Sequence, residues 1–282
     1  MSLLDPREPI AAWSHAGGLI LALAVTWLFW TRCSKRVGLL AGDPGKSTPA
    51  DLTFERGKFV AMLIFGCTLV ICYGASTWYH TVRTGGEPLT RLRRIDHVGI
   101  YLLIAGTYTP AAWSLLEGAW RRGTLGTVWG VAGVCVLRIC VGGILPAWVS
   151  TLIYLSMGWG VVFCYRELAL GLGHRTLLPL PVGGVLYSVG AVINLAGWPV
   201  LMPGLLGAHD LFHFFVIAGS ACHVLFMVRT VIPASQPVGW RARPAPAPAV
   251  PPPHLFARSG KERQGEAGAF GPHSGPYDTT SI

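Results

Sequence analysis

The sequence predicts an all-α integral membrane protein, built as a bundle of seven transmembrane helices. Three observations predict this fold class. Charged residues make up 12% of the 282-residue chain, whereas a typical soluble domain has about 25%. Hydrophobic residues reach 52%, and the mean hydropathy is +0.50. The apolar residues gather into runs of about 20, the length that a helix needs to cross a bilayer.

Seven runs are long and apolar enough to span a membrane. In chain order they cover residues 13–30, 59–78, 98–116, 125–141, 148–165, 178–198 and 205–231. A polar segment with several glycines and prolines separates the first two runs, so we expect the longest loop at residues 31–58. Pro146 breaks the chain between the fourth and fifth runs. Tryptophans that favour the lipid–water interface stand at the ends of several runs: Trp13, Trp30, Trp78, Trp148 and Trp198.

The composition divides the chain into a membrane domain and a tail. Residues 1–232 contain all seven runs and form the predicted membrane domain. Residues 233–282 are rich in proline, alanine and glycine, with alternating proline and alanine within 243–253. Such a composition cannot bury a hydrophobic core, so we expect a disordered tail.

The net charge of +9 points to a membrane surface rather than to nucleic acid. The lysines and arginines lie mainly between apolar runs, where anionic headgroups and topology explain them. We expect membrane lipids as partners, a lipid-like small molecule as the candidate ligand and no nucleic acid. The expected location is a bacterial-type plasma membrane, with multiple spans. The oligomeric state stays open.

The orientation in the membrane is open as well. The face that carries the N-terminus has five of the 22 lysines and arginines, and the other face has sixteen, five of them in the tail. By the positive-inside rule, this distribution favours a cytoplasmic C-terminus.

Polar side chains within the predicted helices gather at one membrane face. Ionisable residues in a bilayer are costly and are functional candidates by default. Because successive helices alternate in direction, the second run ends at the face where the first, third and seventh begin. The polar residues at this face are His15, Ser76, His80, Asp96, His209 and His213. Span parity places them at one face without requiring that their helices be neighbours.

The spacing of the histidines predicts a metal site. His209 and His213 are four residues apart, on one helix face, as two imidazoles that bind one metal ion are. His80 can supply a third nitrogen, and this ligand set favours zinc (Zn2+), although iron, nickel and copper also accept it. Three protein ligands leave one position for water, as in catalytic zinc sites. Asp96 is then the candidate proton acceptor or orienting group, and Ser76 is the candidate hydrogen-bonding partner.

Structural interpretations compete with these functional ones. Two histidines four residues apart also arise by chance, and a lipid headgroup contact explains His15 equally well. His223 lies 14 residues after His209, about 21 Å along a helix, so we expect it to pack between helices. For Asn194 we expect a polar contact between helices. The seven scattered cysteines indicate neither disulfides nor a metal site.

Several motifs, in order, resemble one known family. The motifs are Glu8 with Ser14-His15, Ser76-x-x-x-His80, Arg94-x-Asp96-His97, the run 105–110 (Ala-Gly-Thr-Tyr-Thr-Pro), and His209-x-x-x-His213 followed by Phe214, Gly219 and His223. Over residues 8–231, the chain resembles the hemolysin III branch of the progestin and adiponectin receptor family.

The resemblance implies a seven-helix bundle with zinc near one membrane face. Its ligands would be His80, His209 and His213, with Asp96 contacting a metal-bound water and Ser76 nearby. The family is also similar to alkaline ceramidases, which implies hydrolysis of a lipid amide. Relatives of the adiponectin receptor type have a cytoplasmic N-terminus, against the charge count above.

Three functional hypotheses follow. The first is a zinc-dependent hydrolase of a lipid amide or acyl bond. The second is a non-enzymatic membrane receptor or regulator in which zinc links helices. The third is a pore-forming protein, which the sequence supports least, because the polar groups cluster at one end of the spans instead of forming a continuous stripe.

Overall fold

The computed structural model describes residues 6–43, 45 and 47–237. Its elements are α1 (Pro9–Gly42), α2 (Pro49–Thr81), α3 (Gly86–Leu115), α4 (Gly118–Gly142), α5 (Ala147–Trp159), α6 (Val161–Leu172), α7 (His174–Leu177), α8 (Pro179–Ala196), α9 (Ala208–Phe226) and the π-helix η1 (Met227–Val231). The all-α fold class is therefore confirmed. Most of the predicted tail, from residue 238 onward, lies outside the described residues.

Within the part of the chain that the structure describes, the helices form seven candidate membrane spans, as predicted. Each of α1 to α4 is one span, whereas the last three spans combine two elements each: Ala147–Leu172, His174–Ala196 and Ala208–Val231. Large apolar side chains face outward, such as Phe163 and Val141 with 81% and 82% exposure. An outer surface of this kind fits contact with acyl chains rather than water.

The predicted loop at 31–58 is wrong in extent, because both flanking helices continue into it. α1 ends at Gly42 and α2 starts at Pro49. A capping box begins α2, in which Asp51 N donates to Thr48 Oγ1 over 3.2 Å and Thr48 N donates to Asp51 Oδ2 over 2.9 Å. Charged residues in these turns lower the hydropathy without breaking the helix, so the sequence pattern ended both runs too early.

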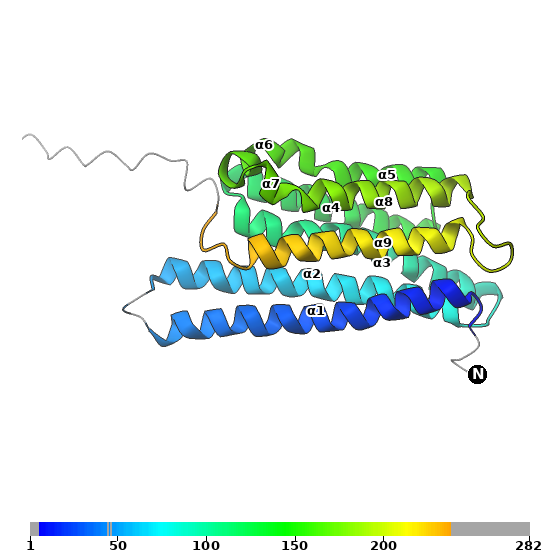
Figure 1. Cartoon of the computed structure of the whole chain (residues 1–282), viewed down its shortest axis with the longest axis horizontal. Coiled ribbons are helices and arrows are strands. Elements are labelled where there is room, and N and C mark those ends of the chain that lie inside the picture. Colours follow the sequence, from blue (N-terminus) through cyan, green and yellow to red (C-terminus); the bar gives the residue numbers. More distant parts are fainter. Residues whose placement is uncertain (1–5, 44, 46, 238–282) are drawn as a thin grey trace, which may run out of the picture. The chain divides into compact units, whose positions relative to one another are not determined.

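Small residues allow close approach between neighbouring helices. Figure 1 shows α1 beside α2 and α8 beside α9, and both pairs share extensive contacts. A Cβ atom added at Gly18 of α1 would lie 2.8 Å from the ring of Tyr73 in α2. A Cβ atom added at Gly99 of α3 would lie 3.0 Å from the Cα of Cys72. Glycine at such positions lets helices pack tightly in a bilayer.

A buried lysine joins the beginning of α2 to the end of the last span. Lys58 is fully buried, and its Nζ donates to Glu55 Oε1 over 2.9 Å. The same Nζ donates to the backbone oxygens of Ile232 and Ala234, at 3.1 Å and 2.5 Å. We call these four residues the Lys58 clamp. Carbonyls left free at the end of a helix thus gain a charged donor.

The other end of α2 meets the start of α1. Glu8 N donates to His80 O over 3.1 Å, and Arg7 N donates to Thr81 O over 3.4 Å. α9 also begins at this end (Figure 1). The beginning of α1, the end of α2 and the beginning of α9 therefore surround one region, as span parity predicted.

Candidate metal centre

Three histidines converge where α2 ends and α9 begins. His80, His209 and His213 each offer a ring nitrogen, and these nitrogens lie within 4.8 Å of one another. The Nε2 atoms of His80 and His209 are 3.4 Å apart. His80 and His213 are each 1% exposed, whereas His209 is exposed. The predicted ligand set is thus assembled, with its open side at His209.

The imidazole of His80 is oriented by a carboxylate from the start of α1. Glu8 Oε2 lies 2.5 Å from His80 Nδ1, and Arg7 Nη2 lies 3.1 Å from the other carboxylate oxygen of Glu8. The hydrogen bond with His80 lowers the pKa of Glu8 below its usual value, so the carboxylate is ionised at neutral pH. An ionised carboxylate only accepts hydrogen bonds. His80 Nδ1 therefore carries the proton, and the Nε2 lone pair is available inside the cluster.

The other two histidines are held in the same manner. His209 Nδ1 lies 3.0 Å from Asn194 Oδ1 in α8. His213 Nδ1 lies 3.3 Å from Ala11 O in α1. Both oxygens are acceptors, so each Nδ1 donates and each Nε2 is left for a metal ion. A hydrogen bond on the outer nitrogen is what fixes the ring orientation and tautomer of most metal-binding histidines.

The two predicted catalytic residues lie beside the histidines. Ser76, one turn before His80 on α2, is 2% exposed. Its hydroxyl donates to the carboxylate of Asp96 in α3, which is within electrostatic reach of His80. The Asp96 side chain is 13% exposed. A carboxylate that is nearly buried, with a serine donor and a histidine beside it, is suited to hold or accept a proton.

His15 belongs to the cluster, and its interpretation as a headgroup contact is wrong. The residue is 4% exposed, and its ring stacks on that of His213 at a centroid distance of 3.7 Å. Tyr73 meets the His15 ring edge-on at 5.1 Å. Neither nitrogen of His15 has a hydrogen-bond partner among the described residues. His15 is outside the group of converging ligand atoms, so it presents an unused donor and acceptor next to them.

Some of the remaining polar residues have the roles that the sequence predicts, and others do not. As expected, His223 packs between helices, with its ring 5.5 Å from that of Tyr187, and it is not one of the converging histidines. Asn194 makes the expected contact between helices, but its partner is a candidate ligand. The orienting roles of Glu8, Asn194 and Ala11 O were not predicted from the sequence. Glu8 stood in a quoted motif, whereas a backbone oxygen leaves no signal in a sequence.

Comparisons with known proteins agree with this architecture. The family described as Haemolysin-III related matches residues 5–224. The chain is 34% identical over 180 residues to Hemolysin-3 of Bacillus cereus, covering 63% of this chain and 78% of that protein. It is 35% identical over 163 residues to the Hemolysin-3 homolog of Bacillus subtilis (strain 168), covering 57% of this chain and 73% of the relative.

Proposed function

The chain belongs to the Haemolysin-III related family, and from this premise we propose that it is a zinc-dependent hydrolase of an amide or acyl bond in a membrane lipid. The observation that carries the proposal is the convergence of three oriented imidazoles next to the Ser76–Asp96 pair. Three histidines that leave one side open match the ligand set of catalytic rather than structural zinc.

Zinc fits the donor set of this site. All three ligands are imidazoles whose Nδ1 atoms are occupied by oxygen acceptors, and neutral imidazole Nε2 is a preferred zinc ligand. When bound, the ion would supply Lewis acidity and a water whose pKa is about 7.

The residues around the metal position have distinct roles in the proposed reaction. The Asp96 carboxylate accepts a proton from the attacking water and returns it to the leaving amine or alcohol. Ser76 holds that carboxylate in place. His15 stacks on the ring of His213 and so helps to hold that ligand in place. Because the site lies near the end of membrane-spanning helices, a lipid can keep its chains in the bilayer while its polar linkage reaches His209.

Metal content tests the premise of the proposal. We expect about one zinc per detergent-purified chain, by elemental analysis, and loss of that zinc in the double variant His209→Ala/His213→Ala. His223→Ala is the matched control, because this histidine lies on the same helix away from the cluster. A well-folded wild type that stays free of zinc after resupply would overturn the assignment.

Turnover tests the reaction. Asp96→Asn should retain the metal but lose about 10²- to 10⁴-fold in rate, the usual contribution of a general acid–base group. Glu87→Gln is the control, since Glu87 is an exposed acid near the same end of the bundle that pairs with Arg91. The assay is a screen of ceramide-type and phospholipid substrates for release of fatty acid. Equal rates for Asp96→Asn and wild type would rule out this chemistry.

A structural metal is the second candidate function, favoured by one observation. The ligands come from α2 and from α9, which are far apart in the chain, so an ion would join the two helices. A receptor or regulator of this kind should lose much thermal stability on chelation and release no product from any lipid. The relatives' name, Hemolysin-3, raises lysis as a rival, and dye release from vesicles that contain the protein tests it directly.

A further inference from the structure

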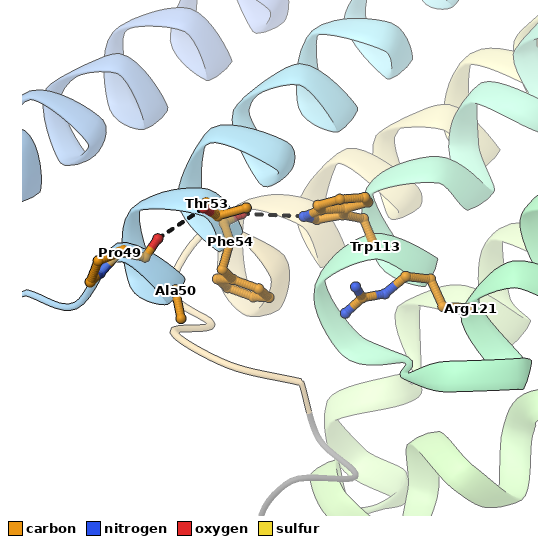
Figure 2. A pocket seen from close by; sticks show the side chains of 6 residues that line it. All are labelled: Pro49, Ala50, Thr53, Phe54, Trp113 and Arg121. Carbon is orange, nitrogen blue, oxygen red and sulfur yellow. Dashed lines mark hydrogen bonds between the residues drawn. The ribbon is translucent and has the colours of Figure 1, made fainter.

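A pocket lies at the opposite end of α2 from the candidate metal centre. Its volume is about 440 Å³. The first turns of α2, the end of α3 and the start of α4 line it, through Pro49, Ala50, Thr53, Phe54, Trp113 and Arg121. Figure 2 shows the guanidinium of Arg121 extending from α4 toward Phe54 below the indole of Trp113. The pocket thus combines an apolar wall with one cation.

The two aromatic residues are fixed in place. Trp113 Nε1 donates to Phe54 O over 3.2 Å. The indole lies directly on Gly57, where an added Cβ atom would be 1.9 Å from a ring atom. Because glycine at this position leaves room for the ring, the wall of the pocket is part of the α2–α3 packing and is formed before any ligand arrives.

The cation is placed with its terminal nitrogens available. Arg121 Nε donates to Leu116 O over 2.9 Å, and the guanidinium carbon lies 4.9 Å from the centre of the Trp113 ring. A guanidinium held through Nε and one ring face still has its two terminal nitrogens, whose fork geometry matches a phosphate. Glu117 is within electrostatic reach of this charge, and it is not among the six lining residues.

We propose that this pocket binds an anionic phospholipid, with the phosphate on Arg121 and the glycerol and upper acyl chain against Phe54 and Trp113. The pocket opens at the end of membrane-spanning helices, where headgroups lie. Exposed Trp120, in the first turn of α4, lies at the same level, as interfacial tryptophans do. Basic pockets between transmembrane helices are a known form of headgroup site.

The chemistry selects an anionic lipid over a choline lipid. The six lining residues include one cation and no carboxylate, so nothing in the pocket pairs with a quaternary ammonium. Aromatic faces can bind such an ammonium, but Arg121 already covers the face of Trp113. At the start of α2, Thr48 and Asp51 are hydrogen-bonded to each other in the capping box. We therefore assign recognition of the phosphate to Arg121.

Native mass spectrometry of the full chain tests the proposal. Detergent-purified protein is offered phosphatidylglycerol and phosphatidylcholine in equal amounts, and bound lipids are counted for wild type, Arg121→Gln and Arg122→Gln. The control, Arg122, is an exposed arginine next in the chain and is not among the lining residues. We expect wild type and Arg122→Gln to bind more phosphatidylglycerol than phosphatidylcholine. In Arg121→Gln the ratio of the two bound lipids should fall about fivefold.

A folding control and a conservative variant complete the experiment. Thermal melting verifies that each variant is folded, and Arg121→Lys, which keeps the charge but not the fork, should retain an intermediate preference. An unchanged preference in Arg121→Gln, or an equal loss in Arg122→Gln, would overturn the proposal. The melting temperature is also measured with inorganic phosphate and with phosphatidylglycerol. An equal rise in melting temperature with both would overturn the proposal, because the occupant would then be a free anion.

Discussion

The hydrogen bond between Glu8 and His80 gives a quantitative prediction about metal affinity. Loss of a partner that orients a metal-bound histidine typically lowers affinity about 10- to 100-fold. The Glu8 side chain is 43% exposed, so water replaces part of the interaction, and we expect the lower limit for Glu8→Ala. That limit, about tenfold, corresponds to about 1.4 kcal/mol.

Glutamine at position 8 separates the effect of the carboxylate charge from the effect of the hydrogen bond to His80. Glu8→Gln keeps an oxygen acceptor for His80 Nδ1 but removes the negative charge, and charge-assisted hydrogen bonds are about twice as strong as neutral ones. We therefore expect a zinc affinity between those of wild type and Glu8→Ala. The other two outer hydrogen bonds, to Asn194 Oδ1 and Ala11 O, are unchanged in both variants.

The assay is competition for zinc between purified protein and a chromogenic chelator of known affinity. Glu87→Gln serves as the control for loss of a carboxylate near the same membrane face. Two results would refute the reasoning: wild-type affinity in Glu8→Ala, or an equal decrease in Glu87→Gln. The first would mean that helix packing alone orients His80, and the second that the general charge of this face sets the affinity.

Two further predictions concern stability. Lys58→Met should lower the free energy of unfolding by about 3 kcal/mol, the lower end for breaking a buried ion pair, because Glu55 still has an arginine partner. Denaturant titration in detergent measures this loss. A smaller loss in the double variant Lys58→Met/Glu55→Gln would support the pairing. Gly18→Ala should lower stability by about 1–3 kcal/mol by overpacking against Tyr73. Gly17→Ala, whose new Cβ meets nothing within 4 Å, should leave the melting temperature unchanged, and equal shifts in both variants would contradict the packing argument.

The sequence was sufficient to predict the spans and the membrane face of the site. Seven apolar runs fixed the number of crossings, and parity then placed His80 and His209 at one face. Neither step needed tertiary contacts. Helix boundaries were harder, because residues 31–42 and 49–58 continue helices through turns rich in charge. Hydropathy measures the preference of a residue for lipid rather than its preference for a helix.

The rotation of each helix about its axis was beyond the sequence. Rotation decides that Asn194 faces His209 and that His15 stacks on His213. Both residues were recognised as polar groups inside spans, but a pattern of single residues does not show which neighbour they meet. The pocket at Arg121 was missed for the same reason. It is formed by three helices whose lining residues are ordinary interfacial ones, so only their arrangement makes a site.

The Lys58 clamp and the candidate metal centre hold the two ends of the last span in different ways. The last span, Ala208–Val231, has 24 residues, about 36 Å of helix. It meets α2 near its beginning, where His209 faces His80, and just past its end, where Lys58 binds Ile232 O and Ala234 O. At the first end the two Nε2 atoms face each other as acceptors, so only a bound ion would join them, whereas at the second end the Lys58 ammonium already makes the link. The last span is therefore anchored to α2 at one end by the fold itself and at the other only when an ion is present.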